Sequence, residues 1–313
     1  MSPLASHWSA SWPVLAAYAA LAGTHLLGLA LSGGRPEAGR RREAGAFHGG
    51  LLLALLALVS PLAYWADLYI WVRAVQDLLL AVVAPGLIVL GAPWAVFGRA
   101  LRLRAGPATG APATGAATTG APATGAATTG APPTPAAGIP PAPPWWLRQP
   151  LAAVLVFNVI WLGWHLPAPF QRALASPAAA AAEHLMYLGA GILFWLQLIG
   201  SRPYRPVAPP LRRATLLVST VAADTVLGMV LVFSSGVLYP AYANAAHHVM
   251  TVVEDQQVAG AVLWMGMLPP MITAAVTVLL GWLNDEESLA LSAGIDRLLT
   301  QRNTHWPSRP RFR

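Results

Sequence analysis

Histidines and carboxylates stand at the ends of several long apolar segments of this chain. They are His165, Glu183 with His184, His247 with His248, and Glu254 with Asp255. Imidazole and thioether groups suit copper, and imidazole also suits zinc. Because the chain has no cysteine, histidines supported by nearby methionines are its available copper ligands. The alternative is that these histidines are amphipathic anchors at a membrane interface, and that the methionines only pack.

A copper site is therefore one hypothesis for this set. It would use His165, His184 and either His247 or His248 as ligands. Glu183 or Asp255 would then accept a hydrogen bond from one of these histidine rings and orient it, as carboxylates do at many metal sites. Two solitary histidines, His25 and His48, stand apart from the set.

Three further ionisable residues lie within apolar segments, where such groups are expensive and often functional. Arg73 and Asp77 are four residues apart, so they share a helix face and are expected to neutralise each other. The alternative is that Arg73 pairs with Glu183 across helices. Asp224 is expected to be a hydrogen-bonded packing residue, with proton relay as the alternative.

The elements that position these residues are long apolar segments. Of the residues, 56% are hydrophobic and only 10% are charged, whereas a soluble domain carries about a quarter charged residues. Segments of about 20 apolar residues are typical of membrane-spanning helices. The sequence predicts an all-α bundle of seven, at about 11–32, 47–65, 68–91, 151–166, 178–198, 214–238 and 258–283.

The arginines predict the orientation. They concentrate in alternate loops, after the first, third and fifth segments and in the C-terminal tail. Positive residues favour the cytoplasmic side, which places the N-terminus outside and the C-terminus in the cytoplasm of a cell-membrane protein. The same arginines explain the basic balance of the chain without nucleic-acid binding.

A repeated segment divides the chain. The decamer TGAPATGAAT occurs twice in succession from Thr109, and its composition cannot form a core. We expect four regions: helices one to three in 1–102, a disordered linker in 103–144, helices four to seven in 145–284, and a cytoplasmic tail in 285–313.

Several short motifs, in their order and spacing, resemble the cytochrome c oxidase assembly factors of the CtaG type. The motifs are Phe47-His48-Gly49-Gly50, Val83-Ala84-Pro85-Gly86-Leu87, Trp164-His165-Leu166-Pro167, Glu183-His184, Leu238-Tyr239-Pro240 and Asp255-Gln256-Gln257. The resemblance implies a seven-helix membrane protein that helps to mature the oxidase through its copper centre. It points to His165, Glu183, His184 and Asp255 as the site and to an oxidase subunit as the partner.

One departure from the family pattern bears on copper. The family places two histidines four apart in the third helix, where this chain has Arg73 and Asp77. A guanidinium cannot ligate copper and repels a cation. The expected function is a non-enzymatic assembly factor acting at the copper centre. The alternatives are a metal-free scaffold of the same fold and a small-solute or copper transporter, although no inverted repeat supports transport.

Overall fold

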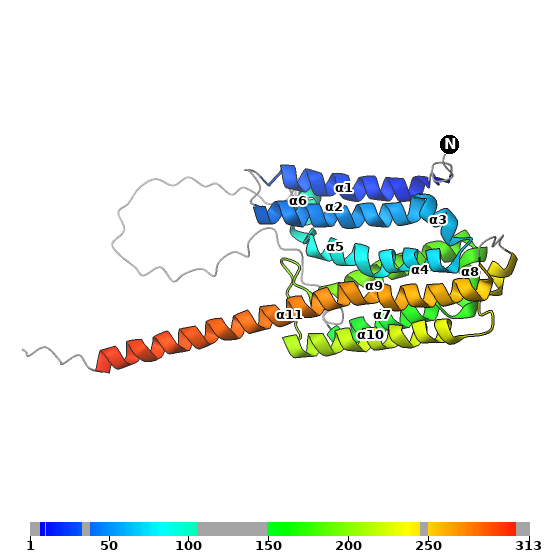
Figure 1. The fold of residues 1–313 in the computed structure, drawn as a ribbon. Helices are drawn as coiled ribbons and strands as arrows, with labels where there is room; N and C mark the ends of the chain where they lie inside the picture. Colours follow the sequence, from blue (N-terminus) through cyan, green and yellow to red (C-terminus); the bar gives the residue numbers. More distant parts are fainter. Residues whose placement is uncertain (1–6, 10, 33–37, 105–148, 245–249, 305–313) are drawn as a thin grey trace, which may run out of the picture.

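A computed structural model describes residues 7–9, 11–32, 38–104, 149–244 and 250–304, with the side chains near some helix ends left aside. Within these ranges every regular element is a helix. The helices run roughly parallel or antiparallel in one bundle, and α11 continues well past the others (Figure 1). This confirms the all-α fold. His247, His248 and nearly all of the repeat linker lie outside the described residues.

Three helices form one side of the bundle. They are α1 (Trp12–Ala30), α2 (Ala38–Val59) and the short α3 (Pro61–Ala66). The second span was predicted to continue to residue 65, but α2 ends at Val59. The reason is local: Ser60 is extended before Pro61, and its hydroxyl accepts from the amide of Leu62 to begin α3.

The next span is the centre of the bundle. It comprises α4 (Ile70–Leu78), a π-helical stretch, η2 (Leu79–Val83), and α5 (Ala84–Leu90). Together they make one apolar span of which 78% is buried, against 11% for α1. Helix α6 (Trp94–Arg104) follows and packs against α1. The central span therefore contacts several other helices, whereas α1 is peripheral.

The fourth predicted span, 151–166, corresponds closely to one helix, and a bent second helix follows it. Helix α7 (Pro150–Trp164) and α8 (Pro167–Ala175) meet at an angle of 70°, because Leu166 is extended before Pro167. His165 is the residue that caps α7, as predicted. In the part of the chain that the structure describes, six helices are long and apolar enough to cross a membrane, or seven if this bent pair counts as one span.

Three long helices complete the bundle: α9 (Pro177–Leu198), α10 (Pro210–Phe233) and α11 (Val252–Thr304). The sixth span was predicted to end at residue 238, but α10 ends at Phe233. Glu254 and Asp255 were placed before the seventh helix but lie in the first turn of α11. Gly228 and Gly260 let α10 and α11 approach closely, since a Cβ on Gly260 would meet the Gly228 carbonyl oxygen at 2.7 Å.

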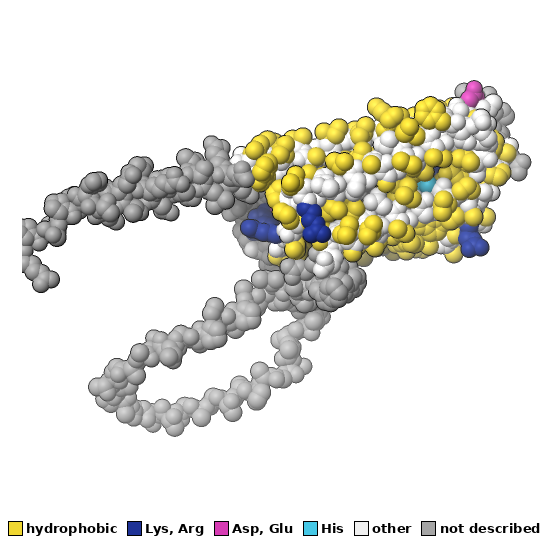
Figure 2. All heavy atoms as spheres, turned by 90° about the horizontal axis from the view of Figure 1, so that it is seen from below, with side chains coloured by type: hydrophobic (Ala, Val, Ile, Leu, Met, Phe, Trp, Pro, Cys, Tyr) yellow, Lys and Arg dark blue, Asp and Glu magenta, His cyan; other side chains and the backbone are white. Residues whose placement is uncertain are grey.

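The surface fits a membrane protein. Hydrophobic side chains cover much of the face shown in Figure 2, and charged side chains appear there chiefly toward its two ends. Many large apolar residues on α1, α7, α10 and α11 are exposed. An apolar belt of this kind is suited to lipid contact.

Candidate functional site

A buried cluster of ionisable groups forms at one end of the bundle, around Arg73 in the first turn of α4. Its guanidinium Nη2 donates to Glu183 Oε2 of α9. Its Nε lies 3.7 Å from Asp77 Oδ1, and its Nη1 lies 3.9 Å from Asp67 Oδ1. Phe170 of α8 packs against the cation, with its ring centroid 5.4 Å away. The cross-helix pair with Glu183, the alternative considered from the sequence, is thus the closest contact of Arg73, and the expected pair with Asp77 lies beside it.

The charged groups of this cluster are deeply buried. Arg73, Asp77 and Glu183 are at most 2% exposed, and a buried charge is costly unless it is paired. The cluster contains two deeply buried carboxylates and one buried guanidinium. Both oxygens of Asp77 and Oε1 of Glu183 have no hydrogen-bond partner. The site is therefore rich in buried acceptors.

His165 adds a further acceptor. Its Nδ1 lies 2.7 Å from the carbonyl oxygen of Trp161, which can only accept, so Nδ1 carries the hydrogen. In the neutral ring Nε2 then holds a lone pair. This Nε2 lies 3.8 Å from Asp77 Oδ2 and has no hydrogen-bond partner. Two buried acceptors face one another, so their approach favours a proton, a water molecule or a cation between them.

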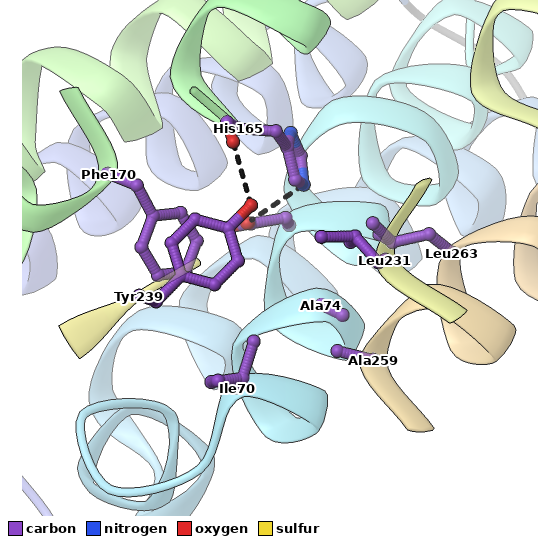
Figure 3. A pocket seen from close by; sticks show the side chains of 9 residues that line it. Ile70, Ala74, His165, Phe170, Leu231, Tyr239, Ala259 and Leu263 are labelled. Atoms are coloured by element: carbon purple, nitrogen blue, oxygen red, sulfur yellow. Dashed lines mark hydrogen bonds and ion pairs between the residues drawn. The ribbon is translucent and has the colours of Figure 1, made fainter. Parts of the chain in front are cut away.

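A small cavity opens where these two groups meet. It has a volume of about 10 Å³ and is lined by Asp77 and His165 among mostly apolar side chains, which is about the least space that holds one water molecule. Figure 3 shows Tyr239 and Phe170 closing one side and Leu231 and Leu263 lying opposite. The Tyr239 hydroxyl donates to the His165 carbonyl oxygen at 2.7 Å. A cavity of this size suits only a very small guest.

Asp255 binds backbone groups at the start of α4. Its two oxygens accept from the backbone amides of Ile70 and Trp71, at 2.8 and 3.0 Å. These amides begin α4 and have no partner within that helix. A carboxylate at this end also complements the helix dipole. Asp255 therefore fixes the start of the helix that carries Arg73 and Asp77.

The two residues after Asp255 hold the segment that follows α10. Gln256 accepts from the amide of Leu238 at 2.8 Å and donates to the carbonyl oxygen of Gly236 at 3.3 Å, and Gln257 donates to the carbonyl oxygen of Ser234 at 3.3 Å. The Asp-Gln-Gln motif is thus a clamp on backbone groups. The sequence does not reveal this role, because the bonded groups belong to main chain distant in sequence.

Two of the predicted copper ligands, His165 and His184, are among the described residues. His165 and His184 both lie near Arg73, and the Nε2 atom of each is buried without a partner. In the described ranges no group of three or more His, Asp or Glu side chains is arranged to hold a metal ion. A guanidinium bonded to Glu183 also opposes a cation there. The described residues alone do not fit a complete copper site.

Two further polar contacts involve residues outside this cluster. Asp224 accepts from Trp161 Nε1 at 3.0 Å, which matches the expected hydrogen-bonded packing residue. His25 and His48 were treated as solitary, but His25 Nδ1 and His48 Nε2 are 3.2 Å apart. They lie on α1 and α2, 23 residues apart in sequence, and nothing in their local sequence signals this contact.

Comparison with known proteins identifies the family. The family model described as cytochrome c oxidase caa3 assembly factor matches residues 23–285. No curated protein and no solved structure matches the chain. The matched range includes every element of the buried cluster, from α4 to the beginning of α11. The chain belongs to the Caa3_CtaG family of cytochrome c oxidase assembly factors.

Proposed function

We propose that this chain assists oxidase assembly as a non-enzymatic scaffold in the cell membrane, holding an oxidase subunit without a metal ion of its own in the cluster around Arg73. The observation that carries this proposal is the Arg73–Glu183 bond, with Asp77 beside it. A fixed guanidinium supplies there the positive charge that a metal ion would otherwise bring. It also orders side chains of α4 and α9 at one end of the bundle.

A variant comparison tests the scaffold role. The host lacking this chain is complemented with the wild type, with Arg73→Gln, or with His165→Asn plus His184→Gln. Asparagine retains a donor near the Nδ1 position of His165 but removes the Nε2 ligand. We expect Arg73→Gln to lower the amount of mature oxidase, measured by its haem absorption, and the histidine double variant to retain it. The reverse pattern would contradict the proposal.

Copper delivery is the second candidate function. It is supported by the free Nε2 atoms of His165 and His184, which are chemically competent copper ligands. In this function the histidines would receive copper and transfer it to the oxidase subunit. His247 or His248 would complete the ligand set, on the expectation from the sequence.

Metal analysis separates the two candidates. The full chain, purified in detergent and loaded with Cu(I) under reducing conditions, is compared with the His165→Asn plus His184→Gln variant. Copper delivery requires the wild type to retain one more equivalent of copper than the double variant. Equal copper contents would eliminate delivery through these histidines and leave the scaffold.

A further inference from the structure

A second polar site lies at the opposite end of the bundle, between α1 and α2. His25 is 1% exposed, and its Nδ1 lies 3.2 Å from Nε2 of half-buried His48. Their rings are nearly perpendicular, with centroids 5.0 Å apart. His25 is five residues from the C-terminal end of α1, whereas Arg73 lies in the first turn of α4 at the other end. The two sites are therefore separate.

Aromatic rings surround the pair. The ring of Phe47 lies 4.2 Å from that of His25, and the ring of Phe97 lies 5.8 Å from it. Phe47 and Phe97 also contact each other edge to face, with centroids 5.5 Å apart. These rings pack around the two imidazoles and shield His25 from solvent.

Close helix packing holds the pair in place. A Cβ on Gly28 of α1 would meet the carbonyl oxygen of Val96 at 2.4 Å, and a Cβ on Gly91 would meet Cβ of Phe47 at 2.5 Å. Only glycine permits these approaches. They fix α1 against α6, and α2 against the end of α5, on both sides of the histidines. In α1 the only buried residues are His25 and Gly28.

We propose that His25 and His48 form a two-coordinate site for a soft monovalent metal ion of the Cu(I) or Ag(I) type. Two neutral imidazole nitrogens aimed at each other are the ligands such an ion needs. Metal–nitrogen bonds of about 2 Å would require the nitrogens to separate by about 0.8 Å from their present 3.2 Å. Because His48 is only partly buried, its ring can make this small shift.

The coordination number favours a monovalent ion over zinc. Structural zinc takes four ligands, and among the described residues no third His, Asp or Glu joins this pair in a metal-binding group. Burying a divalent charge without a carboxylate is also more costly than burying a single charge. This inference is independent of the scaffold function, since it uses none of the residues around Arg73.

Silver provides a redox-silent probe. The full chain, labelled with ¹⁵N-histidine and purified in detergent, is titrated with Ag(I), and imidazole nitrogen shifts are recorded by NMR. The His25 and His48 signals are assigned with His25→Asn and His48→Gln, which retain polar atoms near Nδ1 and Nε2, respectively. We expect the Nδ1 signal of His25 and the Nε2 signal of His48 to shift together at one equivalent. Each variant should weaken Ag(I) binding at this site at least tenfold.

Two control variants complete the test. His7→Gln changes a histidine that stacks on Tyr64 instead, with ring centroids 3.8 Å apart. His165→Asn plus His184→Gln removes the described histidines around Arg73. Both controls should leave the His25 and His48 shifts unchanged. Absence of these shifts in the wild type would overturn the metal site and leave an interhelical hydrogen bond only. Persistence of the His48 shift in His25→Asn, or of the His25 shift in His48→Gln, would do the same.

Discussion

The cluster around Arg73 depends on the buried guanidinium of that residue. Its neighbours Asp77 and Glu183 are both almost fully buried, and Glu183 is its direct partner. Removing one member of a buried ion pair is more damaging than removing both, because the remaining charge is left without compensation. Single and double substitutions at these positions therefore test which carboxylate is coupled to Arg73.

We expect Arg73→Met to destabilise the protein by about 3–5 kcal/mol, because it leaves buried carboxylates unpaired. Arg73→Met with Glu183→Gln should be less destabilising than Arg73→Met alone. The free energies of unfolding are measured by denaturant titration in detergent micelles, as a double-mutant cycle. The matched cycle with Asp77→Asn should give a smaller coupling energy. Equal coupling energies in the two cycles would refute the preference for Glu183.

Contacts between residues of one helix were easier to predict than contacts between residues of different helices. The pairing of Arg73 with Asp77 follows from a four-residue spacing, and the structure places them 3.7 Å apart. The partnership of Arg73 with Glu183, 110 residues apart, was only an alternative, because periodicity does not specify which helices are neighbours. The His25–His48 contact was missed for the same reason.

At the scale of elements, the start of α4 depends on a side chain from another helix. Asp255 of α11 accepts two hydrogen bonds from the first turn of α4. A helix normally has such a cap in its own preceding residue, but Tyr69 provides no side-chain cap here. The orientation of Arg73 and Asp77 is thus linked to the position of α11.

Asp255→Ala should destabilise the protein by about 1–2 kcal/mol, as the loss of a helix cap does. Asp255→Asn should have a smaller effect, since its amide oxygen still accepts one of the two bonds. Hydrogen exchange of the Ile70 and Trp71 amides reports the effect locally and should accelerate most in the alanine variant. If exchange at these amides does not change, the cap does not stabilise α4.

The π-helical stretch η2 has an identifiable cause. Pro85 lacks the N–H that would bond to the carbonyl oxygen of Ala81 one turn earlier, and Trp195 Nε1 of α9 donates to the Val82 carbonyl oxygen at 2.8 Å. Trp195→Phe removes this donor. We expect a loss of about 0.5–1.5 kcal/mol in unfolding free energy, measured by denaturant titration in detergent micelles. An unchanged stability would mean that the bond is not needed.

Helix existence was predictable at this scale, but helix ends and breaks were less so. Long apolar segments indicate membrane helices because lipid offers no partners to backbone groups. The breaks before Pro61 and Pro167 follow from the extended residues Ser60 and Leu166. Averaging over about 20 residues concealed the break at Ser60, since the residues on either side remain apolar, whereas the predicted fourth span already ended at residue 166.

At the scale of the whole molecule, the orientation in the membrane stays a prediction from the arginine-rich loops. A reporter fused within the linker after Thr109 should be active in the cytoplasm, and one fused near Ala245 should be active outside. Reporter activity in detergent-free cells measures both. The opposite activities would reverse the orientation and place the Arg73 cluster on the cytoplasmic side.

Helix α11 has a length that the span itself does not need. It contains 53 residues, of which Val252–Asn284 form the candidate membrane span. At 1.5 Å per residue, the remaining turns project about 30 Å beyond that span (Figure 1). This extension sets the distance from the span, and the direction around the helix axis, at which the chain after α11 continues. Removing seven residues from it would shorten the distance but nearly preserve the direction. Removing two residues would turn the end of the helix to almost the opposite side of its axis.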